Sequence, residues 1–303
     1  MKVFLMASLE NETKNYDNER IKPLSDQIIS RVTAHRSDAL QGVVRTDPAK
    51  LARDYLDLNR SRELFQRLKA FLPKAGGTIL EMGSGFGPFV AYAAKWGKLN
   101  AYGLEPNPIS VAVCRDVQKE VGTPHDHVVR SIGENTPFAS NSMDLVVSFT
   151  VFEHVNDPSK VLQEAVRVLK PGGHLYFTFP NYGSWWEGHY AILWIPHISK
   201  PLARIYLRFL GRNPSFVNHL QLIDYKKLST MVEDLGDQVD VLDYGEKIWE
   251  HRLRSIGIED YAQLGTLKKW VKILHKFRLV DLVIWFGKRA HWETPFVLIL
   301  KKK

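Results

Sequence analysis

"ILEMGSGFG", residues Ile79–Gly87, is the stretch that decides the fold of this chain. It joins a short apolar run, residues 78–82, to a loop with glycine at positions 83, 85 and 87, and a helical pattern over residues 86–97 follows. Glycine allows a backbone to approach a ligand closely, and the first turn of a helix offers unpaired N–H groups. The stretch therefore predicts a strand, a ligand-binding loop and a helix in succession.

Strands and helices continue to alternate along the chain. Apolar runs predict seven strands, at residues 78–82, 100–106, 126–132, 144–150, 174–181, 237–245 and 294–303. Helical patterns at residues 86–97, 108–122 and 158–170 follow three of the first five strands. Continuously apolar strands are typical of a parallel sheet that is covered on both faces. The sequence therefore predicts an α/β fold with a doubly wound, mostly parallel, seven-stranded Rossmann-like sheet.

Three stretches lie outside this alternation. Residues 1–75 predict a helical N-terminal extension, in which Asp47 is an N-cap and Pro48 stands in the first turn of a helix. Within the remaining domain, residues 76–303, we expect two helical insertions. Residues 182–222 are expected to form a lid over the acceptor, and residues 246–292 a basic amphipathic segment.

Composition sets wide bounds on function. The chain has 303 residues and a net charge of +8, which permits nucleic acid, an anionic membrane or an anionic small molecule as partner. Its single cysteine, Cys114, excludes an intrachain disulfide. Its apolar runs are shorter than the roughly 20 residues that a membrane span needs. We therefore expect a cytoplasmic protein, with peripheral membrane contact open and oligomeric state not indicated.

The acidic residues beside the glycine loop restrict its ligand. The loop has the spacing E-x-G-x-G-x-G, beginning at Glu81, rather than the G-x-G-x-x-G of dinucleotide-binding proteins. A carboxylate at the end of the strand suits a cationic group and is wrong for a pyrophosphate. Glu105 ends the second strand, where a carboxylate can accept both hydroxyls of a ribose.

A resemblance to a known family rests on three stretches, which are "ILEMGSGFG", "GLEPNP" and "ENTPFASNSMDLVVSFTVFEHVNDPSKVLQEAVRVLKPGGHLYFTFPN". The chain resembles the class I S-adenosylmethionine-dependent methyltransferases. More narrowly, it resembles the ubiquinone/menaquinone-biosynthesis-like branch of small-molecule methyltransferases, over about residues 76–182. The resemblance implies S-adenosyl-L-methionine as cofactor. The cofactor-binding residues that it implies are Glu81, Gly83, Gly85, Gly87, Glu105, Pro106, Gly133, Glu134, Phe149 and Thr150. One departure is Ile132, which stands where the family often has an aspartate for the adenine amino group.

The acceptor site is expected in "PNYGSWWEGHY", residues 180–190, because the acceptor should lie at the carboxyl ends of the strands. Glu187 and His189 are the candidate carboxylate and general base, and His219 is a rival base. The alternative is a lid with aromatic packing and a histidine that only serves structure. Glu153 and His154 are interpreted as structural, and no metal site is expected.

We therefore expect an O-directed methyltransferase that acts on a small-molecule, sugar or glycan, or lipid-linked hydroxyl. Alternatives are N- or C-methylation of a quinone-like or prenylated acceptor, a non-catalytic binding protein of the same fold, and a nicotinamide oxidoreductase. Nucleic acid is an unlikely partner, because "SFTVFEHV" lacks the Asn/Asp-Pro-Pro-aromatic turn that grips a base amine. The basic, amphipathic stretches 198–211 and 266–289 suggest peripheral contact with an anionic membrane. Packing of these helices on the protein is the alternative, and it is the commoner fate of such patterns.

Overall fold

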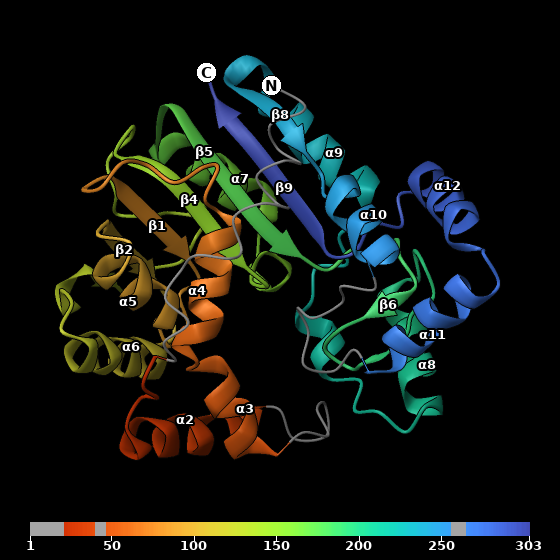
Figure 1. The fold of residues 1–303 in the computed structure, drawn as a ribbon, viewed down its shortest axis with the longest axis horizontal. Coiled ribbons are helices and arrows are strands. Elements are labelled where there is room, and N and C mark those ends of the chain that lie inside the picture. Colours follow the sequence, from red (N-terminus) through yellow and green to blue (C-terminus); the bar gives the residue numbers. More distant parts are fainter. Residues whose placement is uncertain (1–20, 40–46, 256–264) are drawn as a thin grey trace. The chain divides into compact units, whose positions relative to one another are not determined.

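The structure is a computed structural model that describes residues 21–39, 47–255 and 265–303, with side chains described for 21–34, 47–255 and 271–303. Its main feature is a seven-stranded sheet of order β3-β2-β1-β4-β5-β9-β8, and β6 and β7 form a separate pair (Figure 1). The strands are β1 (Thr78–Met82), β2 (Asn100–Leu104), β3 (Val128–Val129), β4 (Met143–Phe149), β5 (Leu169–Phe179), β6 (Trp186–Glu187), β7 (Ile192–Leu193), β8 (Val239–Asp243) and β9 (Phe296–Lys302).

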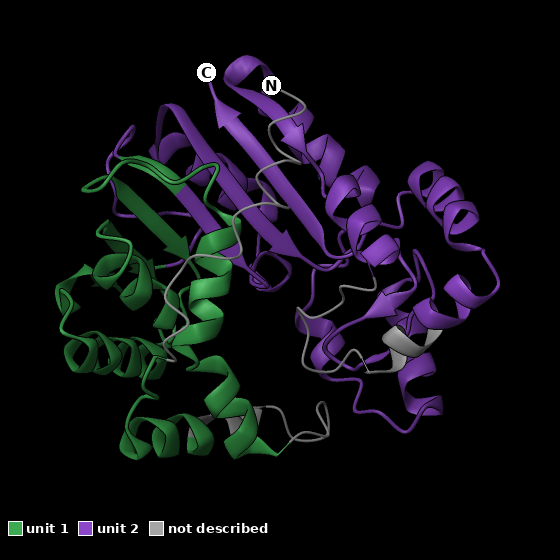
Figure 2. Cartoon of the chain, in the orientation of Figure 1, with its two compact units in different colours: residues 1–37, 47–131, 143–145 green, residues 38–46, 132–142, 146–303 purple. Residues whose placement is uncertain are grey.

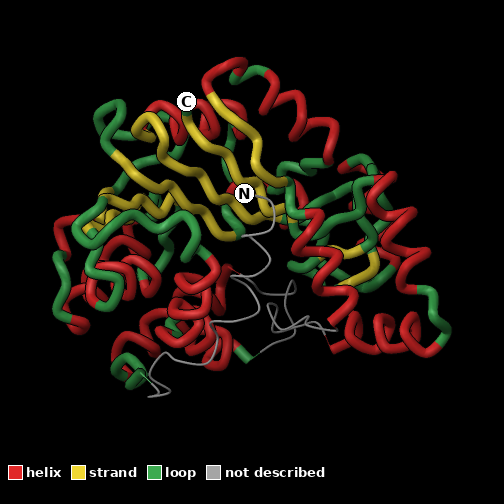
Figure 3. Tube along the Cα trace, turned by 45° about the horizontal axis from the view of Figure 1, so that its top comes forward, coloured by secondary structure: helices red, strands yellow, loops and turns green. Residues whose placement is uncertain are grey.

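The pairing of the strands confirms the predicted fold class. β1 pairs with β2 and β2 with β3 in parallel. β9 lies between β5 and β8 and is antiparallel to both. Figure 3 shows the strands side by side in yellow. The C-terminal strand is thus the reversed element of an otherwise mostly parallel sheet.

The helices begin where the sequence offers a cap. The longer helices are α2 (Asp26–Ala39), α3 (Pro48–Tyr55), α4 (Leu58–Arg67), α5 (Pro88–Lys95), α6 (Pro108–Val121), α7 (Pro158–Val168), α8 (Lys200–Phe209), α9 (Tyr225–Glu233), α10 (Glu246–Ser255), α11 (Gly265–Lys276) and α12 (Val280–Ala290). Asp47, Asn107 and Asp157 each accept hydrogen bonds from N–H groups of the first turn that follows. Each is followed by proline, whose fixed φ suits a first helical position.

Two local predictions were imprecise. β3 has only two residues where a longer strand was expected over 126–132. The helical pattern was expected to run to residue 170, yet α7 ends at Val168 and the "LKPGG" stretch from Leu169 belongs to β5. Gly172 has φ +81, and pairing with β9 starts at His174, so the bend precedes the paired part of the strand.

Two compact units make up the chain (Figure 2). Unit 1 comprises residues 1–37, 47–131 and 143–145, and unit 2 comprises 38–46, 132–142 and 146–303. In unit 1, Ile28 and Leu58 from the N-terminal helices share a buried cluster with Phe86 and Val117. Unit 2 holds one cluster around Tyr190 and Trp194 and another around Trp249 and Val271. The domain and insertion boundaries given above remain predictions.

The glycine loop is fixed by close packing against α6. Gly87 caps α5 with φ +76, and a Cβ at this position would lie 2.0 Å from Cys114 Sγ. Gln118 Nε2 also donates a hydrogen bond to the Gly87 carbonyl at 3.0 Å. Cys114 is fully buried, so its sulfur has little room to move away from an added side chain. Position 87 therefore excludes any side chain for two separate reasons, the clash and the backbone conformation.

We expect Gly87→Ala to lower the free energy of unfolding by about 3 kcal/mol, through the clash and the left-handed φ. Gly85→Ala is the matched control, because Gly85 has φ +53 but no atom lies within 4 Å of the point where a Cβ would stand. It should cost only about 1 kcal/mol. Denaturant unfolding measures both values. Adding Cys114→Ala to Gly87→Ala should restore part of the loss, and no restoration would contradict the packing explanation.

Candidate active site

The glycine loop and Glu105 form one candidate binding element, in unit 1. Glu105 Oε2 accepts a hydrogen bond from the Gly85 N–H at 3.0 Å, and Oε1 accepts one from the Asn107 N–H at 3.0 Å. Gly83, like Gly85 and Gly87, has a positive φ, so the loop turns its backbone in a way that side-chain-bearing residues rarely adopt. The carboxylate of Glu105 is therefore held at the loop, as the resemblance implies, and Pro106 follows it directly.

Glu81 lies at the end of β1, and its carboxylate lacks a partner at one oxygen. The side chain is 7% exposed, and Oε2 has no hydrogen-bond partner. Burial, and then the charge of Glu105, raise the pKa of Glu81 well above its usual value. A cationic group placed there would offset both effects. This orphaned oxygen fits the amino group of S-adenosylmethionine.

The other residues that the resemblance assigns to the cofactor belong to unit 2. Gly133 precedes Glu134, whose Oε1 accepts hydrogen bonds from the N–H groups of Asn156 at 2.8 Å and Asp157 at 3.1 Å. Phe149 ends β4, and Thr150 follows it with φ +54. A β-branched residue in this conformation is strained, and such strain is concentrated at functional sites. Contact of these four residues with the cofactor stays a prediction.

Glu187 and His189 form a buried ion-pair geometry in the segment that follows β5. His189 Nδ1 lies 2.7 Å from Glu187 Oε1, and the Tyr190 N–H donates to Glu187 Oε2 at 2.7 Å. Burial by itself would lower the pKa of His189, but the Glu187 carboxylate, and then Glu153, raise it to a net value above the usual one. Since a carboxylate only accepts hydrogen bonds, Nδ1 carries the proton and Nε2 faces away from Glu187.

Glu153 is the functional candidate that sequence reasoning missed. It follows β4 in the short helix η2 (Phe152–His154), fully buried, and neither carboxylate oxygen has a hydrogen-bond partner. Its Oε1 lies 3.6 Å from His189 Nε2 and 3.7 Å from His154 Nε2. Burial raises the pKa of Glu153 to about 7. The sequence did offer a signal for this role. Glu153 and His154 follow the fourth strand, and in this fold the carboxyl ends of the strands face the ligand site.

His219 is not part of the contacts that join these groups. It ends the short helix η3 (Phe216–His219), and its side chain is exposed. From the same helix, the ring of Phe216 packs 5.3 Å from His189 and 5.7 Å from His154, measured between ring centroids. Of the two candidate histidines, His189 therefore lies within the charged and aromatic cluster and His219 lies outside it.

Aromatic side chains surround the pair, and they divide into packed and exposed ones. Tyr190 and Trp194 are fully buried, and Tyr182 donates a hydrogen bond to Glu187 Oε1 at 3.3 Å. Trp185 is 50% exposed and meets Trp292 edge-on. The segment after β5 thus combines a packed aromatic support with a charged cluster whose His189 side chain remains 20% exposed. That arrangement suits a base that must meet a substrate.

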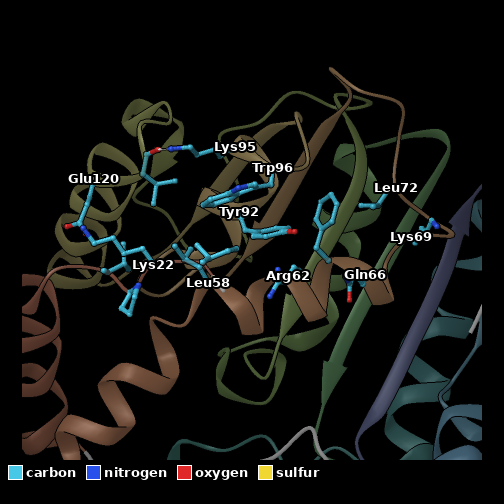
Figure 4. A pocket seen from close by; sticks show the side chains of 15 residues that line it. Lys22, Leu58, Arg62, Gln66, Lys69, Leu72, Tyr92, Lys95, Trp96 and Glu120 are labelled. Atoms are coloured by element: carbon cyan, nitrogen blue, oxygen red, sulfur yellow. Dashed lines mark hydrogen bonds between the residues drawn. The ribbon is translucent and has the colours of Figure 1, made fainter. Parts of the chain in front are cut away.

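A cavity of about 750 Å³ lies elsewhere, in unit 1 (Figure 4). Phe65, Tyr92 and Trp96 line it together with cationic side chains such as Lys22 and Lys95. Trp96 caps the C-terminal end of α5, whereas the glycine loop begins that helix. At 1.5 Å per residue the two ends are about 12 Å apart. The cavity is therefore distinct from the loop that we assign to the cofactor.

Comparison of the sequence with known proteins indicates the family. Residues 80–177 match the model of a methyltransferase domain. The match identifies this part of the chain as a class I S-adenosylmethionine-dependent methyltransferase domain. The enzyme's cofactor is accordingly S-adenosyl-L-methionine, as the resemblance implied.

The names of similar proteins refer to different methyl acceptors. A ubiquinone biosynthesis O-methyltransferase of Pectobacterium atrosepticum is 25% identical over 77% of this chain and 95% of its own length. Thiol S-methyltransferase TMT1B of Rattus norvegicus is 33% identical over 47% of this chain, and the match spans only 59% of that relative. A solved phosphoethanolamine N-methyltransferase 2 of Haemonchus contortus, in complex with S-adenosyl-L-methionine, is 19% identical, with a TM-score of 0.48, over 81% of this chain and 52% of that one. In the part of the chain that the structure describes, no helix has the length and apolarity to cross a bilayer.

Proposed function

We propose that this methyltransferase acts on a hydroxyl oxygen of a small-molecule, sugar-containing or lipid-linked acceptor, with His189 as general base. The observation that carries the proposal is the 2.7 Å contact between His189 Nδ1 and Glu187 Oε1. A hydroxyl is a weak nucleophile at neutral pH and gains from a base, whereas a thiol, with a pKa of about 8.5, needs less help. The pair therefore favours an oxygen acceptor over the sulfur acceptor named for one relative.

When bound, the cofactor supplies an electrophilic methyl group on a sulfonium sulfur. His189 Nε2 would accept the proton of the acceptor hydroxyl as that oxygen takes up the methyl group, and the electron pair of the carbon–sulfur bond would stay on sulfur. Glu187 stabilises the imidazolium that forms. Glu153, 3.6 Å from Nε2 and with a pKa of about 7, is placed to receive the proton next.

For the cofactor, we propose that Glu81 and the loop of Gly83, Gly85 and Gly87 hold the methionine part. Glu105 would accept hydrogen bonds from the ribose hydroxyls. These would replace one or both of the hydrogen bonds that it now accepts from the Gly85 and Asn107 N–H groups. The buried oxygen of Glu81 without a partner supports the first assignment. The roles of Pro106, Gly133, Glu134, Phe149 and Thr150 are proposed from the resemblance alone.

Glu105→Ala should weaken S-adenosylmethionine binding by about 2 kcal/mol, roughly 30-fold, because a charged hydrogen-bond acceptor is lost. Isothermal calorimetry measures the affinity, and circular dichroism checks the fold. The matched control is Asp116→Ala, which removes a carboxylate from the same unit that pairs with Arg31 instead. Equal affinities in the two variants would rule out the assignment of Glu105.

A metal ion is a second candidate role for the same cluster. One ligand atom each of Glu153, His154 and His189 lies within 4.8 Å of the others. A divalent ion there would activate the acceptor hydroxyl as a Lewis acid, in place of proton transfer to His189. Activity that survives exhaustive chelation favours the base, and activity that needs an added metal favours the ion.

His189→Ala should lower turnover about 100-fold or more and leave cofactor affinity unchanged. The acceptor is first found by incubating the enzyme with methyl-labelled cofactor and cell extract, and identifying which atom carries the label. In wild type, the rate should rise with pH through an apparent pKa above 6.5, because a base must be neutral and Glu187 holds the pKa of His189 up. Glu187→Gln should shift this rise to lower pH, because the amide no longer stabilises the imidazolium.

His219→Ala is the control for the choice of histidine and should leave turnover unchanged. A 100-fold loss in His219→Ala together with normal turnover in His189→Ala would show that the wrong base was chosen. Label on a nitrogen, carbon or sulfur atom of the acceptor would contradict O-methylation itself.

A lipid-linked acceptor is supported by exposed apolar side chains on α8, in unit 2. Leu202, Ile205 and Phe209 are 57%, 61% and 86% exposed, and Arg204 and Arg208 lie among them. In α11 and α12 only some of the apolar side chains are exposed. Val271 is buried and Leu274 packs inward, so these two belong to the core of unit 2. Phe277, Trp285 and Phe286 are exposed. The basic stretch 266–289 also contains Leu267, Lys268, Lys269 and Trp270, whose side chains lie outside the described residues.

We expect the protein to pellet with anionic vesicles at low salt, to ignore neutral vesicles and to be released as salt rises. Phe209→Glu with Ile205→Glu should reduce pelleting strongly, because two apolar contacts become anionic. The matched control is Ile109→Glu, an apolar residue 50% exposed on α6. If wild type stays in solution at low salt, the acceptor is a soluble molecule and α8 has another role.

A further inference from the structure

A second group of metal-ligating side chains lies in unit 2, apart from the proposed base. Glu246 begins α10, His291 caps the C-terminus of α12, and Glu293 stands shortly before β9. One ligand atom from each lies within 4.8 Å of the others. The methyl transfer described above uses none of these three residues, so their assembly needs a separate explanation.

Of the three residues, Glu293 has the carboxylate that most needs a positively charged partner. Its side chain is fully buried, and neither carboxylate oxygen has a hydrogen-bond partner. His291 Nδ1, likewise buried without a hydrogen-bond partner, is 3.6 Å from Glu293 Oε1. Burying a carboxylate in this way is costly unless a positive charge is nearby. The site therefore has the polarity of a cation site.

The backbone around these side chains is firmly held. Asn181 Nδ2 donates to the carbonyls of His291 at 2.7 Å and of Glu293 at 2.8 Å. The His291 ring stacks on Tyr225 with an interplanar angle of 2°. His291 also takes a left-handed conformation, with φ +51, at the C-terminal end of α12, where the helix dipole favours positive charge. The ligand atoms are thus largely preorganised.

We propose that Glu246, His291 and Glu293 bind a divalent transition-metal ion, with Zn²⁺ or Mn²⁺ as the fitting class. Imidazole and carboxylate ligands suit these ions, and bond lengths of about 2.0–2.2 Å place tetrahedral ligand atoms about 3.4 Å apart. The His291–Glu293 separation of 3.6 Å is already close to this value. A modest shift of Glu246, which is only partly buried, closes the set, and water or another ligand fills the fourth position.

The ion would act as a brace for the lid. Asn181, which holds the His291 and Glu293 carbonyls, is six residues before Glu187, and Ser184 Oγ donates to the Trp292 carbonyl at 2.8 Å. The loop that carries two of the ligands therefore supports the segment that leads to His189. Glu246 adds α10 to the same point. The proposal is independent of the methyl acceptor, because it concerns how the support is held.

The test is Zn²⁺ binding by calorimetry to the full chain after removal of metal with a chelator. It uses a His154→Ala, His189→Ala background, so that the cluster at Glu153 has lost two ligands. One Zn²⁺ should bind, and Glu293→Gln or Glu246→Gln should weaken it about 100-fold or more. Glu250→Gln is the matched control on α10, because Glu250 pairs with Arg254 and Lys288 and should keep full affinity.

Thermal unfolding separates lost binding from lost folding. Without metal, Glu293→Gln should melt no lower than its parent, because a neutral amide replaces a buried carboxylate. Zn²⁺ should raise the melting temperature of the parent and leave that of Glu293→Gln unchanged. If Glu293→Gln does not fold, the partly exposed Glu246→Gln decides. Absence of saturable Zn²⁺ binding in the parent, or equal affinity in Glu246→Gln and Glu250→Gln, overturns the proposal.

Discussion

A carboxylate that is removed from water needs a positive partner or a proton, and this requirement governs every site described above. Glu187 meets it with the imidazole of His189 and the N–H of Tyr190. Glu81, Glu153 and Glu293 are buried as well, but each has at least one oxygen without a hydrogen-bond partner. A stable fold tolerates such groups only where something else offsets the cost. These three positions are therefore where the structure points to a ligand, a proton or an ion.

Packing explains why these groups can remain unpaired without disturbing the fold. The glycine loop is held against α6 through the contact between Gly87 and Cys114, so its geometry does not depend on Glu81. In unit 2, the side-chain amide of Asn181 fixes the loop at His291 and Glu293 through backbone carbonyls alone. In both places a side-chain amide donates to backbone carbonyls, and in the glycine loop close packing adds to this. The carboxylates are thereby left available for function.

The sequence predicted the local elements well because their signals are local. Period, caps and glycines identified β1, α5 and α6 within a few residues, and the resemblance of the loop and its neighbouring motifs to a known family implied the cofactor. The antiparallel insertion of β9 between β5 and β8 was beyond such signals, because no residue in "TPFVLILKKK" records its neighbours. Glu153 was taken as structural for the same reason: its 3.6 Å approach to His189 joins residues that are 36 positions apart in the sequence. The group of Glu246, His291 and Glu293 could not be predicted from local patterns, because its first two members are 45 positions apart in the sequence.

Glu153 and Glu187 show how two identical side chains receive different properties within one cluster. Burial raises the pKa of both carboxyl groups, but His189 and two backbone N–H groups reverse the effect at Glu187, and its net pKa falls below the usual value. At Glu153, burial prevails, and its pKa rises to about 7. One carboxylate therefore stays ionised and orients the imidazole, while the other is poised to take up or release a proton near neutrality. Because the three groups interact, they titrate as a unit, and the environment of each oxygen, rather than the residue type, assigns its part in the chemistry.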